Sequence, residues 1–194
     1  MHTEIEAKFI NIDLVDFRLK LRGLDATLIS PERLMKRKNF DFKDSSLGNK
    51  NAWVRVRDEG DKVTLSYKQL NDRTLHGTKE INVVVDNFEI TCTFLETIGL
   101  ERKTYQETRR ESWLLNDVEI EIDTWPWVPS FIELEAKTEL DLKHVATSLG
   151  LDLADALHGS VEVVYQKYFH ATEDEIDNLE QITFAGKAPW PRKS

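Results

Sequence analysis

The fold is decided by residues 118–124, Val118-Glu119-Ile120-Glu121-Ile122-Asp123-Thr124, in which acidic and apolar residues alternate. In an extended strand the two acidic glutamates and Asp123 fall on one face, and the valine and isoleucines fall on the other. Carboxylates two positions apart along a strand lie roughly 7 Å apart, and like charges on one face are destabilising. The stretch therefore predicts a strand whose polar face needs a counter-charge.

The same alternation recurs in other segments. Residues 3–10 place Glu4, Glu6 and Lys8 on one face, and residues 130–137 place Glu133 and Glu135 opposite apolar neighbours. Further strands are expected over residues 34–42, 52–58, 62–69, 78–85 and 104–115. Tight turns at residues 59–61 and 116–117 connect two hairpins. The chain is thus mainly antiparallel β, with helices in addition.

Basic residues supply the counter-charge on the polar faces of their strands, namely Lys8, Arg37, Arg55, Arg57, Lys68 and Arg110. A solvated sheet face would also be polar, but it would mix its charges rather than repeat one sign along each strand. A closed antiparallel β tunnel with a polar interior explains the pattern and removes exposed edges. Among Lys36, Arg37 and Lys38, the sequence leaves open which residue faces the interior.

Helices are expected on the outside of this tunnel and at its C-terminal end. Residues 13–24 and 87–98 have apolar residues at helical spacing and could cover the sheet, and residues 140–149 and 160–168 follow the last strand. We expect a tunnel domain over residues 1–170, followed by a tail over residues 171–194 that is acidic and then contains proline and tryptophan.

The bulk composition excludes several classes of protein. The chain has 194 residues, 40% of them hydrophobic, which suits one domain with a sizeable core. A net charge of −9 argues against binding to nucleic acid or to a membrane surface. A single cysteine, Cys92, and the absence of a long apolar run favour a cytoplasmic protein. The oligomeric state stays open, with a homodimer as one option.

The residue types indicate the chemistry. Carboxylates without neighbouring cysteine or histidine favour a hard cation such as Mg²⁺ or Mn²⁺. Arginine and lysine side chains suit phosphate oxygens, and arginine can bind them bidentately. A cavity that holds both kinds of group is suited to a metal-chelated polyphosphate, for which positioning and charge neutralisation supply most of the catalysis.

Glu4-Ile5-Glu6-Ala7-Lys8 resembles the Glu-x-Glu-x-Lys signature of the CYTH superfamily, also called triphosphate tunnel metalloenzymes. Later segments resemble that family in the same order: Asn39-Phe40-Asp41, Trp53-Val54-Arg55-Val56-Arg57, Leu65-Ser66-Tyr67-Lys68, Glu80, Arg109-Arg110-Glu111-Ser112-Trp113, residues 118–123 and Phe131-Ile132-Glu133-Leu134-Glu135. The resemblance covers residues 3–168.

This resemblance implies an eight-stranded tunnel, a triphosphate substrate and Mg²⁺ or Mn²⁺. The implied metal ligands are Glu4, Glu6, Glu121, Asp123, Glu133 and Glu135. Phosphates would be held by Lys8, Arg55, Arg57, Lys68 and Arg110, and the polar face of its strand adds Arg37 to this set. The expected catalytic residues are Glu6, Lys8, Arg57, Glu133 and Glu135.

The chain departs from the family pattern at two places. Thr108 stands two residues before Arg110, where the family often has lysine, so that Lys103 or Arg109 would have to compensate. The family's glycine-rich turn between the last acidic strands is replaced by Trp125-Pro126-Trp127-Val128-Pro129. The number of phosphate contacts and the shape of that rim are therefore open.

The functional prediction is a metal-dependent hydrolase in which water attacks the terminal phosphorus of inorganic triphosphate or an organic triphosphate. The first alternative is a class IV adenylate cyclase, which would release cyclic AMP and pyrophosphate from ATP. Thiamine triphosphate as substrate would call for an aromatic residue at the mouth, for which Trp53, Trp113, Trp125 and Trp127 are candidates. A non-catalytic polyphosphate or nucleotide binding module is the alternative from a different class.

Overall fold

The computed structural model describes residues 2–3 and 5–193 of the chain. In this part of the chain, strands make up one sheet: β1 (His2–Thr3), β2 (Ile5–Phe9), β3 (Thr27–Phe42), β4 (Ala52–Asp58), β5 (Val63–Leu70), β6 (Thr78–Val85), β7 (Leu100–Leu115), β8 (Val118–Thr124), β9 (Phe131–Ala136) and β10 (Gln181–Ile182). The helices are α1 (Leu14–Gly23), α2 (Phe88–Thr97), α3 (Glu139–Leu149), α4 (Glu162–Tyr168) and α5 (Glu173–Asp177), with short 3₁₀ turns at η1 (Gly48–Lys50) and η2 (Leu153–Asp155).

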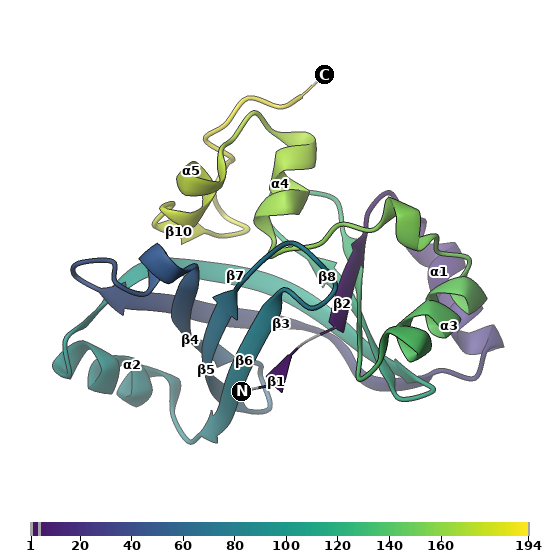
Figure 1. Cartoon of the computed structure of the whole chain (residues 1–194), viewed down its shortest axis with the longest axis horizontal. Helices are drawn as coiled ribbons and strands as arrows, with labels where there is room; N and C mark the ends of the chain where they lie inside the picture. The colour runs from purple at the N-terminus through teal and green to yellow at the C-terminus, as the bar shows by residue number, and fades with distance from the viewer. Residues whose placement is uncertain (1, 4, 194) are drawn as a thin grey trace.

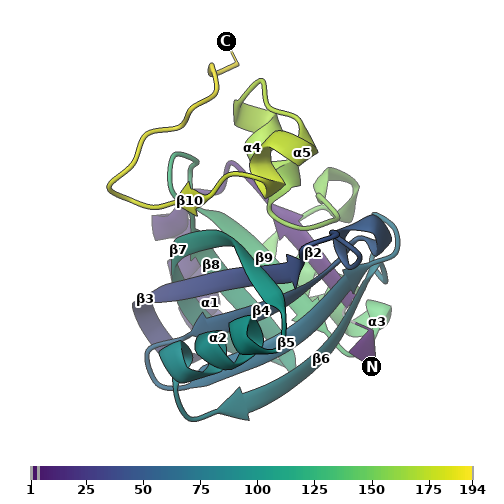
Figure 2. The ribbon, with the colours of Figure 1, turned by 90° about the vertical axis from the view of Figure 1, so that its left-hand side faces the viewer.

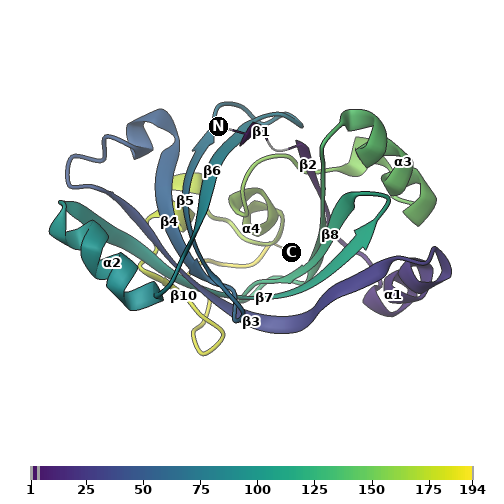
Figure 3. The same ribbon diagram turned by 90° about the horizontal axis from the view of Figure 1, so that it is seen from below.

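The sheet curls into the predicted tunnel, which Figure 3 shows from one end. Its strand order is β1-β6-β5-β4-β3-β7-β8-β9-β2, and every pair in this order is antiparallel. The N-terminal segment meets both edges, because His2 pairs with Glu80 on β6 while Ile5 pairs with Ala136 on β9. Short β10 adds a parallel pair to β7. Counting β1 and β2 as one strand, the expected eight-stranded antiparallel tunnel is confirmed.

Helices α1 and α3 cover the outer face of β2, β8 and β9 (Figures 1 and 3). The alternation of the sequence explains why this face is apolar, since Ile120, Ile132 and Leu134 are buried outward while the acidic residues between them face the tunnel. Asp13 caps α1 by accepting hydrogen bonds from the backbone amides of Val15 and Asp16. The two helices therefore complete a core outside the tunnel.

Helix α2 covers the other half of the sheet. Figure 2 shows it lying along the outer face beside β4. Phe40 and Val56 of the sheet pack there with Cys92 and Leu95 of the helix. Cys92 is thus a packing residue. Both helices that the sequence assigned to the outer surface lie there.

The C-terminal part closes one end of the tunnel, where α4 is seen through the ring in Figure 3. Ser160, Val161, Asp174 and Asp177 from this part line the same cavity as the strands. The tail is packed against it, because the Trp190 ring lies with its centroid 5.9 Å from that of Tyr165.

The predicted strand over residues 34–42 is longer in the structure, since β3 begins at Thr27. Pro31 lies inside this extension, at a register shift between Ser30 and Arg33 and where β3 pairs with β7 but not with β4. Proline is tolerated in a strand at such an edge or irregularity. Strand β7 likewise begins earlier than predicted, at Leu100. No helix among the described residues is long and apolar enough to cross a membrane.

Candidate active site

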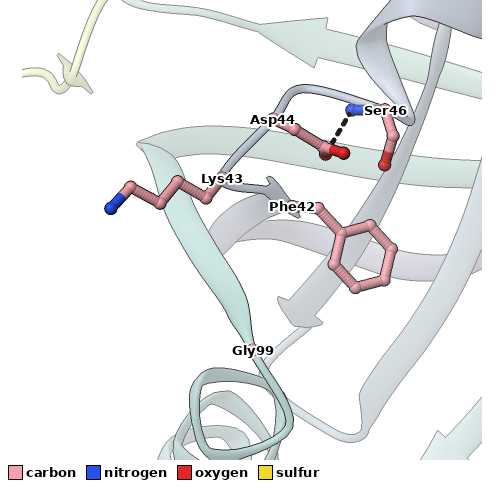
Figure 4. A pocket seen from close by; sticks show the side chains of 5 residues that line it. All are labelled: Phe42, Lys43, Asp44, Ser46 and Gly99. Carbon is pink, nitrogen blue, oxygen red and sulfur yellow. Dashed lines mark hydrogen bonds between the residues drawn. The ribbon is translucent and has the colours of Figure 1, made fainter.

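A cavity of about 1200 Å³ fills the tunnel and is lined by inward side chains from β2 to β9. A smaller hollow of about 430 Å³ lies on the outside, lined by Phe42, Lys43, Asp44, Ser46 and Gly99 (Figure 4). Its dashed contact joins the Ser46 amide to Asp44 Oδ1 at 3.0 Å, a local turn bond. The charged residues singled out by the sequence gather in the large cavity, which is therefore the candidate site.

Three adjacent strands form an acidic wall on one side of this cavity. Glu135 on β9 lies opposite Glu6 on β2 and Glu119 on β8. One step along the ladder, Glu133 lies opposite Lys8 and Glu121. Because neighbouring strands are less than about 5 Å apart, the register brings together carboxylates that are far apart in the sequence.

Lys8 is the first counter-charge of this wall. Its Nζ atom lies 3.0 Å from Glu133 Oε2 and 3.2 Å from Glu6 Oε1. Burial disfavours the ammonium, but Glu133 and Glu6 outweigh burial and hold the pKa of Lys8 above its usual range. Burial also works against the Glu133 carboxylate, yet Lys8 and Arg110 hold its pKa well below the ordinary value.

Arg110 is the second counter-charge of the acidic wall, and it contacts Asp123, Glu133 and Glu121. It donates from Nε to Asp123 Oδ1 at 2.6 Å and from Nη2 to Asp123 Oδ2 at 2.5 Å. Its Nη2 atom lies 3.3 Å from Glu133 Oε1, and its Nε atom lies 3.8 Å from Glu121 Oε2. Arg110 therefore gathers three carboxylates of the acidic wall around one guanidinium.

Part of the acidic wall still lacks positive charge. Burial raises the pKa of Glu121 to about 7 despite Arg110, and Asp123 adds to that rise. Burial likewise raises the pKa of Glu135 to about 7, and Glu133, Glu119 and Glu6 contribute although Lys68 opposes them. Glu121 Oε2 is buried without a hydrogen-bond partner in the described structure. An all-oxygen set with excess negative charge fits a hard divalent cation.

The carboxylates are not arranged as a ready-made metal cage. Within residues 2–3 and 5–193, no group of three or more His, Cys, Asp or Glu side chains is already placed to hold a metal ion. Glu133 and Asp123 instead point at Lys8 and Arg110. Glu4, the remaining predicted ligand, lies outside the described residues. Any cation would therefore bind together with a shift of these ion pairs.

The basic wall comes from β3 to β5. Arg55 lies 3.2 Å from Glu80 Oε1, and Lys68 lies 3.8 Å from Glu80 Oε2. Arg57 donates to Glu59 Oε1 from Nε at 3.0 Å and from Nη2 at 2.7 Å. The structure thus places all three predicted phosphate-binding residues of these strands in the cavity.

Among the adjacent cations Lys36, Arg37 and Lys38 of β3, Arg37 is the one that lines the cavity. Lys36 is exposed, and Lys38 lies on the outside, where its Nζ atom is 2.8 Å from Glu89 Oε2 of α2. Arg37 donates from Nη2 to Thr108 Oγ1 at 3.0 Å and stacks on Trp125, whose ring centroid lies 4.6 Å from Cζ. Burial, followed by repulsion from Arg55, Arg57 and Arg110, lowers the pKa of Arg37 well below its usual range.

The structure also explains the departure at position 108. Thr108 is buried and serves as an acceptor for Arg37. Arg109 does not compensate for the missing lysine, because it lies outside the tunnel with Cζ 4.9 Å from the Phe184 ring centroid. Lys103 lines the cavity, with its Nζ atom 3.3 Å from Glu101 Oε2.

Sequence reasoning missed several residues that line the cavity, among them Arg33 and Glu59 and, from the C-terminal part, Asp174 and Asp177. Arg33 lines the cavity and donates to Ser112 Oγ at 3.1 Å. Its signal was the spacing of Arg33, Met35 and Arg37, but the predicted strand began one residue later, at Leu34. Glu59 was assigned to a turn, but it is buried and accepts hydrogen bonds from Arg57 and Thr64.

Comparison with known proteins agrees with this architecture. A family model described as the CYTH domain matches residues 2–174. No curated protein matches the chain.

Solved structures share the fold at low identity. A conserved hypothetical protein from Pyrococcus furiosus has a TM-score of 0.65 at 20% identity, covering 79% of this chain and 94% of that chain. A Vibrio parahaemolyticus protein provisionally described as an adenylate cyclase has a TM-score of 0.71 at 14% identity, covering 85% and 98%. A Hippeastrum protein, provisionally described as an adenylyl cyclase with a dominant triphosphatase activity, has a TM-score of 0.59 at 15% identity, covering 91% and 95%. At these identities the likeness concerns the fold alone.

Proposed function

The chain belongs to the CYTH domain family, and on that premise we propose that it is a metal-dependent triphosphatase that hydrolyses a triphosphate compound inside its tunnel. The observation that carries the proposal is the pairing of two opposite walls in one cavity. Carboxylates of β2, β8 and β9 face guanidinium and ammonium groups of β3 to β5, with Arg110 between them. A triphosphate and a divalent cation present the complementary charges.

The acidic wall would hold the cation. Glu6, Glu121, Glu133 and Glu135 are the proposed ligands, with Asp123 beside them and Glu4 completing the set named from the sequence. When bound, Mg²⁺ or Mn²⁺ would neutralise charge on the phosphate oxygens and help to activate water.

The basic wall would hold the phosphates. Arg37, Arg55, Arg57, Lys68 and Arg110 are the proposed phosphate ligands. Lys8 lies between Glu6 and Glu133, so it would balance the charge of both carboxylates and donate to a phosphate oxygen nearby. Arg57, at the rim beside Glu59, would stabilise the charge that spreads over the transferred group. Glu133 and Glu135, with Glu6, would orient the attacking water.

The test incubates the purified protein with inorganic triphosphate, ATP and thiamine triphosphate, each with Mg²⁺ and with Mn²⁺. Release of orthophosphate that EDTA abolishes is the expected result. Pyrophosphate with cyclic AMP from ATP would show the cyclase reaction instead. Tight triphosphate binding with no product would overturn the hydrolase and leave a binding module.

A pair of variants ties any activity to the tunnel. Glu133→Gln keeps the side-chain shape but removes the charge that Lys8 and Arg110 contact, so we expect a loss of at least a hundredfold in kcat. Glu96→Gln alters an exposed glutamate on α2, outside the tunnel, and should leave kcat unchanged. Circular dichroism of both variants checks that they fold. Full activity in folded Glu133→Gln would contradict the assigned role.

A further inference from the structure

Most cations of the cavity have a carboxylate partner, but Arg37 has none in the described structure. Arg33 also lacks one, but its guanidinium donates to the Glu59 and Arg110 carbonyls and to Ser112 Oγ. Lys8, Arg57 and Arg110 each form ion pairs within 3.3 Å. In the described part of the chain, Arg37 has no ion pair, and its Nε atom is buried without a hydrogen-bond partner. A buried guanidinium with unused donors is costly unless something else stabilises it.

Trp125 is the group that stabilises it. The indole centroid lies 4.6 Å from Arg37 Cζ, within the range of a cation–π contact. Trp125 is only 5% exposed, and it lies in the rim segment that replaces the family's glycine-rich turn. With Cζ over the indole ring and Nη2 donating to Thr108 Oγ1, the Nε donor of Arg37 stays without a hydrogen-bond partner in the described structure.

The Trp125 indole itself packs against the C-terminal part of the chain. Its ring meets Tyr165 edge to face at a centroid distance of 6.3 Å. The Tyr165 hydroxyl donates to the Pro126 carbonyl at 2.9 Å, which fixes the rim backbone next to Trp125. Trp190 of the tail packs on the other side of Tyr165. Trp125 therefore has little freedom to leave the guanidinium.

We propose that Trp125 is a positioning residue that holds Arg37 across the cavity with its donors free for an anionic oxygen of the substrate. The inference rests on the proposed triphosphate substrate, and it adds a residue to which no role in the site has been assigned. Without the indole, Arg37 would gain conformational freedom, and the nearby Asp123 carboxylate would compete for its donors.

The test measures the affinity of inorganic triphosphate by calorimetry in EDTA, so that binding is separated from hydrolysis. Trp125→Leu keeps an apolar side chain but removes the π face, and we expect a roughly 5- to 30-fold loss of affinity. Trp125→Phe keeps a weaker π face and should restore most of that affinity. Trp190→Leu is the matched control, because it removes one ring of the same aromatic cluster and leaves the contact between Trp125 and Arg37 in place. It should lower Tm but leave the affinity unchanged.

A double-mutant cycle with Arg37→Gln decides whether Trp125 acts through Arg37. In the Arg37→Gln background, Trp125→Leu should cause less than a twofold further loss of affinity. Equal losses in both backgrounds, or equal losses in Trp125→Leu and Trp190→Leu, would overturn the positioning role. If the wild-type protein binds triphosphate but releases no phosphate with Mg²⁺ or Mn²⁺, the hydrolase proposal fails while this inference stands. If no triphosphate binds, both fail.

Discussion

Arg110 and Asp123 face each other across the β7–β8 ladder, and both carboxylate oxygens of Asp123 accept hydrogen bonds from the same guanidinium. Asp123 is 2% exposed. A ligand of either side chain would therefore compete with this pair. An anion that attracts Arg110 would release Asp123, and a cation that attracts Asp123 would release Arg110.

The first prediction is that triphosphate and Mn²⁺ bind cooperatively for this reason. A non-hydrolysable imido analogue of triphosphate should raise Mn²⁺ affinity about tenfold, within the usual range of coupling between sites. Calorimetric titration of Mn²⁺ with and without the analogue measures the factor. Arg110→Gln should reduce the coupling more than it reduces Mn²⁺ affinity alone. Equal coupling in the variant would show that Arg110 is not the link.

The second prediction concerns Lys8, which is buried between two carboxylates. Lys8→Met should lower the free energy of unfolding by about 3 kcal/mol, because it leaves Glu6 and Glu133 without their shared cation. Mg²⁺ should restore part of this loss by supplying positive charge at the same wall. Urea unfolding with and without Mg²⁺ tests both points. Lys143→Met, on the exposed face of α3, should change neither the free energy of unfolding nor its response to Mg²⁺.

The third prediction is that metal affinity rises with pH. The pKa values of Glu121 and Glu135 are raised to about 7 by burial and by neighbouring carboxylates, and a cation requires both groups ionised. Mn²⁺ affinity should therefore increase between pH 6 and pH 8, with proton release on binding that is largest below pH 7. Titrations in buffers of different ionisation enthalpy measure the protons. Glu135→Gln should release fewer protons than Glu96→Gln.

The fourth prediction is that the metal-free protein becomes less stable over the same pH range. The pKa values of both glutamates are raised on folding from an ordinary value of 4.5. Between these values the folded chain holds protons that the unfolded chain has lost, so these two groups contribute stability at low pH that disappears as pH rises through 7. Urea unfolding from pH 5.5 to pH 8 should show this fall. An unchanged slope in Glu135→Gln would argue against the assignment.

The fifth prediction separates binding from stability at Glu59. This buried carboxylate holds Arg57 and Thr64, and burial is outweighed by Arg57, which lowers its pKa. Glu59→Gln should cost about 1 to 3 kcal/mol of folding free energy while raising triphosphate affinity, because Arg57 is then free to bind phosphate. Asp117→Asn changes an exposed acid in the turn between β7 and β8, outside the cavity lining, and should alter neither quantity. If Glu59→Gln lowered the triphosphate affinity as well as the folding free energy, the prediction would be contradicted.

Alternation in the sequence predicted most of the tunnel because each strand has one apolar and one charged face. The bounds predicted for β4, β6 and β8 match the structure, and charged and apolar residues alternate clearly in β4 and β8. The start of β3 was missed because Pro31 and two register shifts break the period there. Strand β10 was missed because a two-residue strand carries no periodic signal.

The membership of the cavity was largely predictable, whereas its internal contacts were not. Lys36, Arg37 and Lys38 are adjacent cations, and the choice among them depends on the register of β3. The contact of Arg110 with Glu133 joins strands that are not neighbours in the sheet, so it depends on the curl of the sheet as well as on the strand faces. The stacking of Arg37 on Trp125 depends on where a proline-rich rim places one ring, which residue types alone do not specify.

The two-edged pairing of the N-terminal segment has a consequence for how the chain folds. Ile5 pairs with Ala136 and His2 with Glu80, so the ring closes only when the first residues meet partners far along the chain. Contacts of such high contact order pay their loop-closure entropy late and make folding slow. Before that step, the acidic side chains of β2 and β9 are not enclosed together in one cavity. Assembly of the binding chamber and completion of folding are thus one kinetic event.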